Sequence, residues 1–504
     1  MYLHKINDEF TYVDEPYVSQ NTFIGRTPED APLPTYEESR ALLPHPVWEG
    51  HEDTVRAGEF AWKTAFGNLR RVKPGSGLVS NFIDTAFNDF LFMWDSSFIV
   101  MFGKYAARAF CFQHTLDNFY AVQHRDGFIC REISEEECAG HFTRYDPSAT
   151  GPNIMPWCEW EYYSLTGDKK RLAEVFPPLM AYHHWVRRHY TWRDGSYFST
   201  GWGCGMDNQP RLEEGYHDAF DHGYMIWADA CIQAVLSAKT LIKMARELGR
   251  ESEAADMQEE AERLTKLINE VLWDDKTAFY YDQYRDGRLN GVKSIGAYWA
   301  LLADVVPAER LDRFVAHLEN EAEFNRPHRP PTLSADHEKY DPQGGYWCGG
   351  VWAPTSYMTL KGLERIGRER LAFEIAQNSV ENVSRVFAED GTLYENYAPE
   401  SASRGRPAKS DFVGWSGLFP ISVFYEYVLG IRADSAAQEI VWHVNLTERH
   451  GIENYPFGDA VVDLLADARK PGEKPVVHVR ADKPVTVRVI WENGEETVAA
   501  EIGR

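Results

Sequence analysis

Amphipathic helical segments recur along most of the chain, and this recurrence constrains the fold more than any other feature. Within residues 228–247, for example, apolar side chains fall at helical spacing. Short turns and long loops rich in Gly, Asp and aromatic residues alternate between such segments. This alternation predicts six helical hairpins closed into an (α/α)6 toroid. The rival architecture, a helical solenoid, would need a fixed repeat period, and the sequence shows none. Helical segments are expected at 53–70, 96–121, 153–165, 172–190, 221–249, 252–273, 293–304, 307–319, 351–367, 369–388 and 416–430.

The two ends of the chain differ from this helical region in composition and in the spacing of apolar residues. Residues 1–50 are polar and proline-bearing, which predicts an N-terminal arm that wraps a larger body. Residues 51–431 make up the predicted catalytic domain. Beyond 432, β-branched runs separated by turn signals predict a small antiparallel β domain over 432–504.

Charge argues against several classes of partner. The formal net charge is −25, whereas nucleic-acid binding needs clustered Lys and Arg, so we expect no nucleic-acid partner. The same charge disfavours an anionic membrane surface, and no apolar run approaches the length of a membrane span. We therefore expect no membrane partner, and nothing in the sequence indicates an oligomeric state.

Cysteine usage and cofactor motifs bear on the compartment of the protein and on its need for a cofactor. The seven cysteines form no C-x-x-C pair, and most sit among apolar or aromatic neighbours. This pattern is typical of reduced thiols in a cytoplasmic protein, and from the polar residues at its start we expect no signal peptide. No metal-ligand cluster, phosphate loop or dinucleotide fingerprint is evident, so we expect no cofactor.

Two acidic loops could supply acid–base chemistry. Residues 201–211 hold three glycines and Pro210, which predicts a loop with Asp207 as its only acid and Trp202 as a flat face for a sugar ring. Far downstream, Glu395 lies between two tyrosines, which would raise its pKa, with basic residues nearby that would lower it. Two such carboxyls about 6.5–9.5 Å apart perform inverting glycoside hydrolysis. The alternatives are a helix cap for Asp207 and a solvated loop acid for Glu395.

Other loops place acids, cations and rings where a sugar pocket could form. Asp95 follows Trp94 at an expected helix start, where it could bind sugar hydroxyls or cap the helix. Arg131 and Glu132 form a charged pair at a loop end or on the surface. Further rings near helix starts could line subsites or belong to the core; they are Trp157, Tyr346, Trp347, Trp352 and Trp415.

The motifs resemble a known family when they are taken in order along the chain. They are Trp94-Asp95-Ser96, Gly205-Met206-Asp207-Asn208-Gln209-Pro210-Arg211, Tyr346-Trp347, Val351-Trp352, Tyr394-Glu395-Asn396-Tyr397 and Gly414-Trp415-Ser416. The sequence resembles glycoside hydrolase family 63 and the related family 37 trehalases over about residues 50–430. Those enzymes are inverting α-glycosidases with an (α/α)6 catalytic domain.

The resemblance implies roles for particular residues. Asp207 would be the general acid and Glu395 the general base. One departure stands out: Cys348 and Gly350 occupy positions where relatives commonly carry arginine and proline, which could alter specificity. The predicted substrate-binding set, from the resemblance and the aromatic loops together, is Trp94, Asp95, Arg131, Trp157, Trp202, Asn208, Arg211, Tyr346, Trp347, Trp352, Tyr397 and Trp415.

The sequence thus predicts an inverting, exo-acting α-glycosidase, most like an α-glucosidase, that hydrolyses a small oligosaccharide or glycoside. Two alternatives stay open. A sugar epimerase or isomerase on the same fold would move protons with histidines, and His183, His184, His217 and His222 lie near the Asp207 region. A non-catalytic carbohydrate-binding protein would use the same tryptophans.

Overall fold

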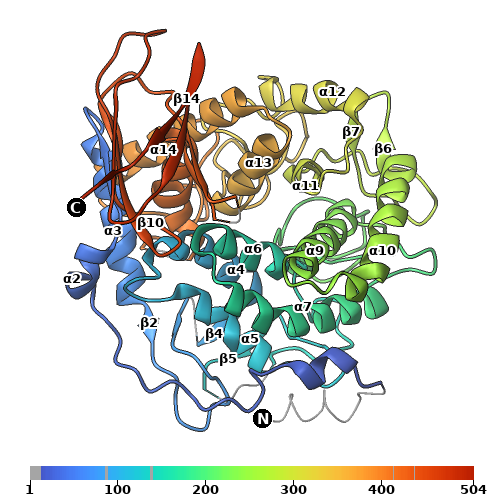
Figure 1. Ribbon diagram of the computed structural model, residues 1–504. Helices are drawn as coiled ribbons and strands as arrows, with labels where there is room; N and C mark the ends of the chain where they lie inside the picture. Colours follow the sequence, from blue (N-terminus) through green and yellow to red (C-terminus); the bar gives the residue numbers. More distant parts are fainter. Residues whose placement is uncertain (1–12, 86–88, 137–139, 412–413, 436, 504) are drawn as a thin grey trace.

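The computed structural model describes residues 13–85, 89–136, 140–411, 414–435 and 437–503, and it is mainly helical with β-sheets at the C-terminal end (Figure 1). Six helical segments follow one another in contact, and the last of them contacts the first. They are α4 (Met93–Gly103), α6 (Met155–Thr166), α9 (Ala228–Glu247), α11 (Trp299–Leu302), α13 (Ala353–Arg365) and the π-helical η9 (Phe419–Val428). Within the described ranges, no helix combines the length and apolarity that crossing a bilayer requires.

Burial separates these six segments from helices farther out. All residues of α4 and of η9 are buried, as expected of helices that are apolar on every side. By contrast, α12 (Ala308–Glu319) buries only Phe314, Val315 and Leu318, which form one stripe. The other outer helices likewise bury one face; they are α3 (Glu52–Gly67), α7 (Lys169–His189), α10 (Ala255–Leu267) and α14 (Glu369–Asp390).

Most predicted helical segments are present, but the prediction of one helix over 96–121 was wrong. There α4 ends at Gly103 and is followed by η3 (Lys104–Ala106), η4 (Phe112–Leu116) and α5 (Asp117–Ala121). The chain turns back because Phe112 packs directly on Gly103, where an added Cβ would lie 2.4 Å from that of Phe112. The segment expected at 293–304 is likewise split, into η7 (Ile295–Tyr298) and α11.

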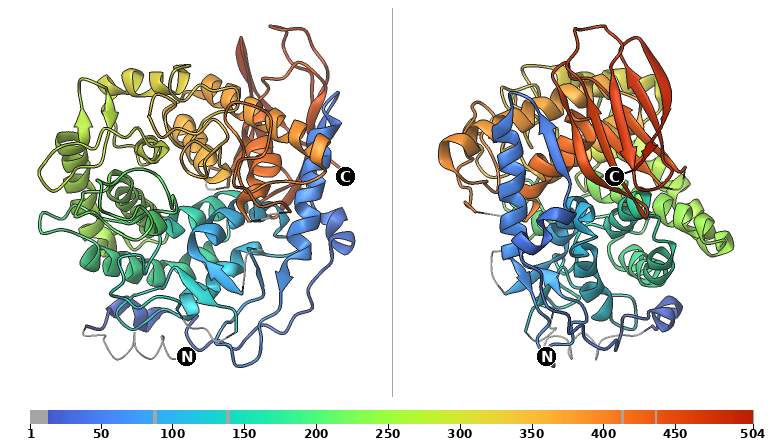
Figure 2. Two further views of the ribbon diagram at one scale, coloured as in Figure 1. Left: turned by 180° about the vertical axis from the view of Figure 1, so that it is seen from behind. Right: turned by 60° about the vertical axis from the view of Figure 1, so that its left-hand side comes forward.

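Two sheets form at the C-terminal end, and the N-terminal arm contributes a strand to one of them. The five-stranded sheet has the order β1-β10-β11-β12-β15, and the four-stranded sheet has the order β14-β13-β9-β8. β1 (His45–Trp48) pairs antiparallel with β10 (His450–Phe457), so this strand of the N-terminal arm lies beside the C-terminal strands (Figure 2). The remaining strands are β8 (Ile431–Asp434), β9 (Glu439–His443), β11 (Ala460–Ala466), β12 (Val477–Ala481), β13 (Thr486–Trp491), β14 (Gly494–Ala499) and β15 (Glu501–Ile502).

The prediction of a purely antiparallel β domain was wrong in two places. β12 pairs parallel with β15, and β13 pairs parallel with β9. Period-two alternation shows which face of a strand is buried but carries no information on strand direction. The β region packs on the helices through contacts of β8 and β10 with α6.

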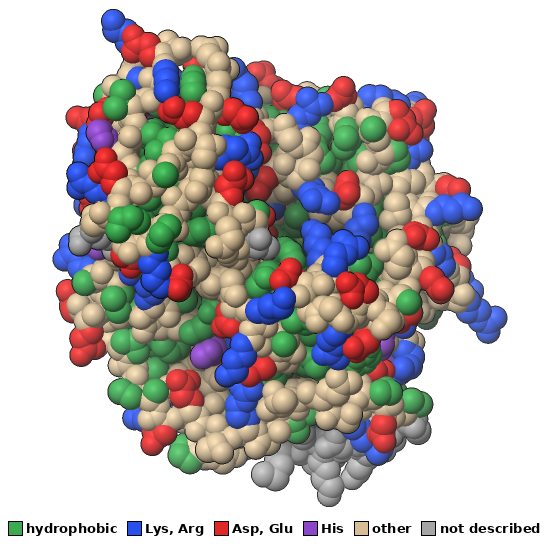
Figure 3. All heavy atoms as spheres, viewed as in Figure 1, with side chains coloured by type: hydrophobic (Ala, Val, Ile, Leu, Met, Phe, Trp, Pro, Cys, Tyr) green, Lys and Arg blue, Asp and Glu red, His purple; other side chains and the backbone are tan. Residues whose placement is uncertain are grey.

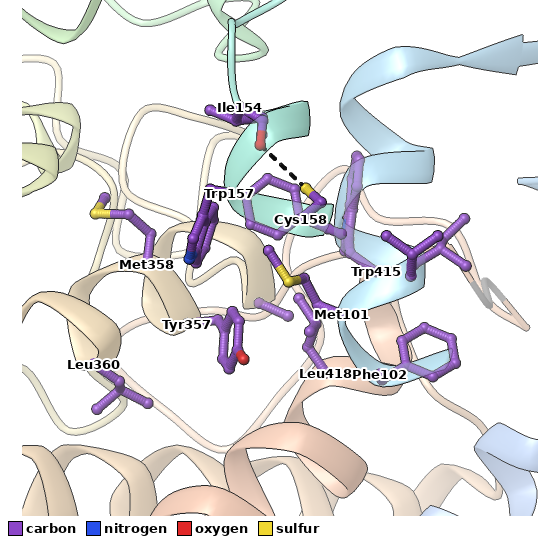
Figure 4. Packing of buried hydrophobic residues seen from close by; sticks show 14 of the residues in the cluster. Met101, Phe102, Ile154, Trp157, Cys158, Tyr357, Met358, Leu360, Trp415 and Leu418 are labelled. Carbon is purple, nitrogen blue, oxygen red and sulfur yellow. Dashed lines mark hydrogen bonds between the residues drawn. The ribbon is translucent and has the colours of Figure 1, made fainter. Parts of the chain in front are cut away.

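The core where α4, α6, α13 and η8 (Trp415–Leu418) meet is built of large rings and sulfur-bearing side chains (Figure 4). Trp157 of α6 faces Tyr357 of α13 with ring centroids 6.1 Å apart, and it meets Trp299 edge-on at 5.6 Å. The Sγ of Cys158 donates to the carbonyl oxygen of Ile154 at 3.3 Å. This packing fixes the helix ends from which the candidate site projects.

Candidate active site

A cavity of about 430 Å³ lies at the N-terminal ends of several of the six contacting helices. Its walls come from the first turn of α4, the residues before α6, the residues before α13 and the start of η8. The lining residues are Phe92, Met93, Trp94, Asp95, Arg131, Glu132, Gly151, Pro152, Trp202, Gly205, Asp207, Tyr346, Trp347, Lys409 and Trp415. Eight predicted site residues are therefore together here: Asp207, Trp94, Asp95, Arg131, Trp202, Tyr346, Trp347 and Trp415.

A short helix brings Asp207 to this cavity. The stretch expected to be entirely loop begins with one helical turn, α8 (Gly201–Cys204), which Thr200 caps by accepting a hydrogen bond from the backbone N–H of Gly203 at 2.9 Å. Gly205 then adopts φ +79°, and its backbone lies against Trp94, where an added Cβ would be 2.7 Å from the indole ring. The next long helix, α9, has Trp227 at its N-cap, so Asp207 is not a helix cap.

The environment of Asp207 favours its protonated form. Burial raises the pKa of Asp207 to about 7, the positive charge of Arg131 acts in the opposite direction, and the charges of Glu395 and Glu132 raise the pKa further. Arg131 is itself paired with Glu132 at 2.7 Å, so its positive charge is partly offset. A carboxyl with this pKa can still hold a proton near neutral pH, as a general acid must.

Glu395 is held by hydrogen bonds that favour its charged form. Its side chain is buried, which raises its pKa and excludes the solvated loop acid considered from the sequence. The backbone N–H of Lys409 donates to Oε2 at 3.1 Å, and the hydroxyl of Tyr346 donates to Oε1 at 3.2 Å; both bonds lower the pKa. Glu395 thus contacts two lining residues of the cavity, Tyr346 and Lys409, while its backbone pairs with that of Lys409.

Three buried polar atoms of the cavity wall have no hydrogen-bond partner among the described residues. They are Nε1 of Trp94, Oδ1 of Asp95 and Nη2 of Arg131. Asp95 lies in the first turn of α4, whose N-cap is Phe92, so helix capping does not account for it. Burial, together with the charges of Glu395 and Asp207, raises the pKa of Asp95 well above its usual value. Buried donors and acceptors normally find partners, so this set matches a hydroxyl-bearing ligand.

Strand pairing explains why Arg131 reaches the cavity. β5 (Glu132–Ser134) pairs antiparallel with β4 (Phe90–Phe92), and the backbone N–H of Met93 donates to the carbonyl of Arg131 at 2.8 Å. The guanidinium of Arg131 then lies over the ring of Trp202, 5.1 Å from its centroid. One face of Trp202 is therefore already covered by a cation.

The structure does not bring Arg211 and Trp157 to the cavity lining. Arg211 is buried, and its guanidinium donates to the carboxylates of Asp229 and Asp282 at 2.6–2.9 Å. Trp157 belongs to the core described above, and its Nε1 donates to Glu161 at 3.1 Å. Both side chains have protein partners that account for their burial.

Three further predicted residues surround the cavity from behind instead of lining it. Asn208 donates to the carbonyl of Gly345 at 3.0 Å and accepts from the backbone N–H of Trp347 at 2.9 Å, which joins the Asp207 loop to the Tyr346 loop. Trp352 stacks on Trp347 with centroids 3.8 Å apart. The hydroxyl of Tyr397 accepts from the backbone N–H of Tyr394 at 3.1 Å.

The two positions that depart from the related sequences also lie behind the wall. Sγ of Cys348 donates to the carbonyl oxygen of Asn208 at 3.1 Å. A Cβ at Gly350 would lie 2.4 Å from the carbonyl oxygen of Tyr346, so this loop has no room for a proline there. Gly350 thus permits the close packing of the loop that carries Tyr346.

Sequence reasoning missed several lining residues. Glu132 and Lys409 had been noticed only as a charged pair and as part of a basic loop, and nothing in the local pattern showed that they face the cavity. The others, which are apolar or glycine, carry no chemical signal in the sequence; they are Phe92, Met93, Gly151, Pro152 and Gly205. None of the described lining residues is a histidine, which disfavours histidine-based isomerase chemistry.

Comparisons with known proteins agree with this geometry. Residues 89–416 match the mannosylglycerate hydrolase MGH1-like glycoside hydrolase domain. An uncharacterized protein of Borreliella burgdorferi is 23% identical over 390 residues, which cover 75% of this chain and 79% of that protein. A periplasmic trehalase of Salmonella newport is 22% identical over 195 residues, which cover 38% of this chain and 31% of the trehalase. The structure of a GH63 mannosylglycerate hydrolase from Thermus thermophilus in complex with glucose has the same fold at 18% identity, with a TM-score of 0.59 over 73% of this chain and 99% of that one.

Proposed function

Because the chain belongs to the mannosylglycerate hydrolase MGH1-like glycoside hydrolase family, as its motifs predicted, we propose that it is an inverting, exo-acting α-glycosidase. One observation carries the mechanistic part. Asp207 and Glu395 approach one cavity, and their surroundings differ: burial raises both pKa values, that of Asp207 to about 7, but at Glu395 two hydrogen bonds that favour the carboxylate oppose the rise. Two carboxyls in such contrasting environments are suited to act as acid and base.

In this mechanism Asp207 donates its proton to the glycosidic oxygen as the bond to the anomeric carbon breaks. Glu395 accepts a proton from a water molecule that attacks the anomeric carbon from the opposite face. The hydrogen bonds from Tyr346 and from the backbone of Lys409 orient the Glu395 carboxylate toward that water. The products are the free sugar with inverted configuration and the aglycone.

We assign the reacting sugar to the part of the cavity that holds the unpartnered atoms of Trp94, Asp95 and Arg131. Hydroxyl groups both donate and accept, so a sugar ring can satisfy all three atoms at once. The T. thermophilus relative is described in complex with glucose, which supports an α-glucoside as the first substrate to test.

The aglycone would lie along an aromatic surface outside the cavity. Phe220 contacts the ring of Trp202 edge-on at 4.5 Å and is 44% exposed, and His217 stacks on Phe220 at 4.3 Å. The backbone N–H of Trp202 donates to the carbonyl of Ala219 at 3.0 Å, which holds this surface next to Asp207. Exposed rings of this kind suit the apolar face of a second sugar.

The architecture and location of the predicted enzyme belong to the same proposal. The closed succession of helix contacts supports an (α/α)6 toroid over residues 51–431, with a β domain over 432–504 and an arm at 1–50. We propose a reducing, cytoplasmic compartment because the cysteines of the described residues carry free thiols.

The first test is hydrolysis of a panel of α- and β-linked glucosides, mannosides and glycosyl glycerates, with proton NMR identifying the anomer released first. Release of the β-anomer from an α-glycoside supports the mechanism, and release with retention contradicts it. Asp207→Asn and Glu395→Gln should each lower turnover by about 10²–10⁴-fold with unchanged circular dichroism. Conversion of free sugars without hydrolysis would favour an isomerase, and binding without turnover would favour a carbohydrate-binding protein.

A further inference from the structure

A second and larger cavity, of about 570 Å³, lies at the other end of the same helices. It is lined by the C-terminal parts of α6, α9, α11 and α13, whereas the candidate active site is lined by N-terminal ends. Residues of β8, β9 and β13 complete its wall, so it lies between the helical region and the sheets. We call it the basal cavity. Figure 3 shows Lys and Arg side chains gathered in a hollow on this face, over α9 and α13.

The charges that line the basal cavity do not cancel. Six cationic side chains stand against five acidic ones, in a chain whose net charge is −25. Most of these groups pair with one another: Lys361, for example, lies 3.2 Å from both Glu161 and Glu364. Lys104 and Arg432 join the same network. This part of the lining is therefore electrostatically satisfied.

Three cations of the lining lie outside that network, and one of them, Arg488, pairs with Glu439 and Glu495, which do not line the cavity. Lys243 of α9 forms no ion pair with any described residue. Arg365 at the end of α13 has its acidic partner, Asp304, at 3.5 Å and outside the lining. Burial lowers the pKa of Lys243, and the charges of Arg365 and Lys239 lower it further against the opposite effect of Glu161. Lys243 and Arg365 thus repel each other, and an anion between them would relieve the repulsion.

The wall next to Lys243 offers surface for an organic group. The ammonium of Lys243 lies 5.9 Å from the ring centroid of Trp160, and the apolar side chains of Leu236 and Leu302 also line the cavity. In addition, Nε of Arg432 is buried without a hydrogen-bond partner among the described residues. The cavity therefore combines cations, a ring and an unpartnered donor, and its volume exceeds that of an inorganic anion.

We propose that the basal cavity binds a small organic phosphate, with its phosphate near Lys243 and Arg365 and its organic part against Trp160. A phosphate dianion matches two adjacent cations in charge, and Arg can bind it with two parallel N–H groups. The site is separate from the candidate active site, so it does not depend on the proposed hydrolysis. Its place between the helices and the sheets suits an effector that stabilises their docking.

Isothermal titration calorimetry with glucose 6-phosphate, in chloride buffer of constant ionic strength, tests this proposal. We expect one molecule bound per chain and at least tenfold weaker binding in Lys243→Met and in Arg365→Met. The matched control is Lys266→Met, which removes an exposed lysine that is 3.9 Å from Glu270, and it should bind as the unmodified protein does. Circular dichroism and melting curves verify that the variants are folded.

Three outcomes would overturn the proposal. Absence of binding would mean that the cations only offset the partial negative charge at the C-terminal ends of the helices. Binding that persists in both charge variants, or that is lost in Lys409→Met, would place the ligand elsewhere. Inorganic phosphate that binds as tightly as glucose 6-phosphate would exclude a role for the organic part, whereas weaker binding supports it.

Discussion

The hydrogen bond from Tyr346 to Glu395 makes a quantitative prediction for Tyr346→Phe. The substitution keeps the ring, which meets Trp352 edge-on at 4.8 Å, and removes only the hydroxyl that donates to Oε1 of Glu395 at 3.2 Å. Burial, with the charges of Asp207 and Glu395, raises the pKa of the Tyr346 phenol far above its usual range. The hydroxyl therefore keeps its proton at every working pH and acts on Glu395 only as a donor.

The size of the effect follows from the geometry. Hydrogen bonds to charged groups contribute about 1.5–3 kcal/mol, and this one is longer than usual for an O–H donor, so we take about 1.5 kcal/mol. The bond stabilises the carboxylate, so its loss makes Glu395 bind a proton about tenfold more tightly. A general base must be deprotonated, and the acidic limb of kcat/KM should therefore move up by about one pH unit.

The assay is the pH profile of kcat/KM on the best substrate of the panel, measured for the unmodified enzyme and for Tyr346→Phe. Because the alkaline limb is set by Asp207, the two limbs should approach each other and the maximum should fall. Tyr394→Phe is the matched control, since its hydroxyl donates to Asp390 at 3.0 Å and not to Glu395. An acidic limb that stays in place or moves down in Tyr346→Phe would refute the assignment of Glu395 as the base.

Three other substitutions test the surroundings of the site. Glu132→Gln removes a negative charge that raises the pKa of Asp207, so the alkaline limb should move below about pH 7; an unchanged limb would contradict this. Arg211→Met leaves two buried carboxylates unpaired and should lower the free energy of unfolding by about 3–5 kcal/mol in urea titration, whereas a loss under about 1 kcal/mol would mean that the triad is dispensable. Asn208→Ala removes the acceptor of the Trp347 backbone N–H, so we expect a larger fold-change in kcat than in KM. A change in KM alone would instead favour the substrate contact predicted for Asn208 from the sequence.

The helical region could be predicted because apolar spacing directly reports which face of a helix is buried. The same periodicity gave the wrong result at 96–121, where Gly103 permits a close contact that only the tertiary structure defines. The strand runs after residue 432 were recognisable from alternation. Pairing of β1 with β10, by contrast, joins residues about 400 positions apart, and no local pattern encodes such a partner.

Within the candidate site, residues could be predicted where chemistry and context coincide in a short motif. Asp207 stands alone as an acid among glycines, and Asp95 follows a tryptophan. The same reasoning could not separate Trp202, which lines the cavity, from Trp352, which stacks behind it, because the sequence around each offers the same kind of aromatic signal. Their difference is one of orientation, and orientation depends on contacts from other segments.

The different environments of Asp207 and Glu395 have one structural origin, which is the kind of neighbour each carboxyl receives. Asp207 lies in a turn where the positive charge of Arg131 opposes the rise in its pKa, but Glu132 already pairs with that cation, so burial dominates and the pKa of Asp207 is raised to about 7. Glu395 lies beside Lys409, and a backbone N–H and a phenol donate to its two oxygens. Neutral donors stabilise a carboxylate without offsetting its charge. These donors counteract the rise that burial causes in the pKa of Glu395, which suits this carboxylate to withdraw a proton from water while Asp207 still has one to give.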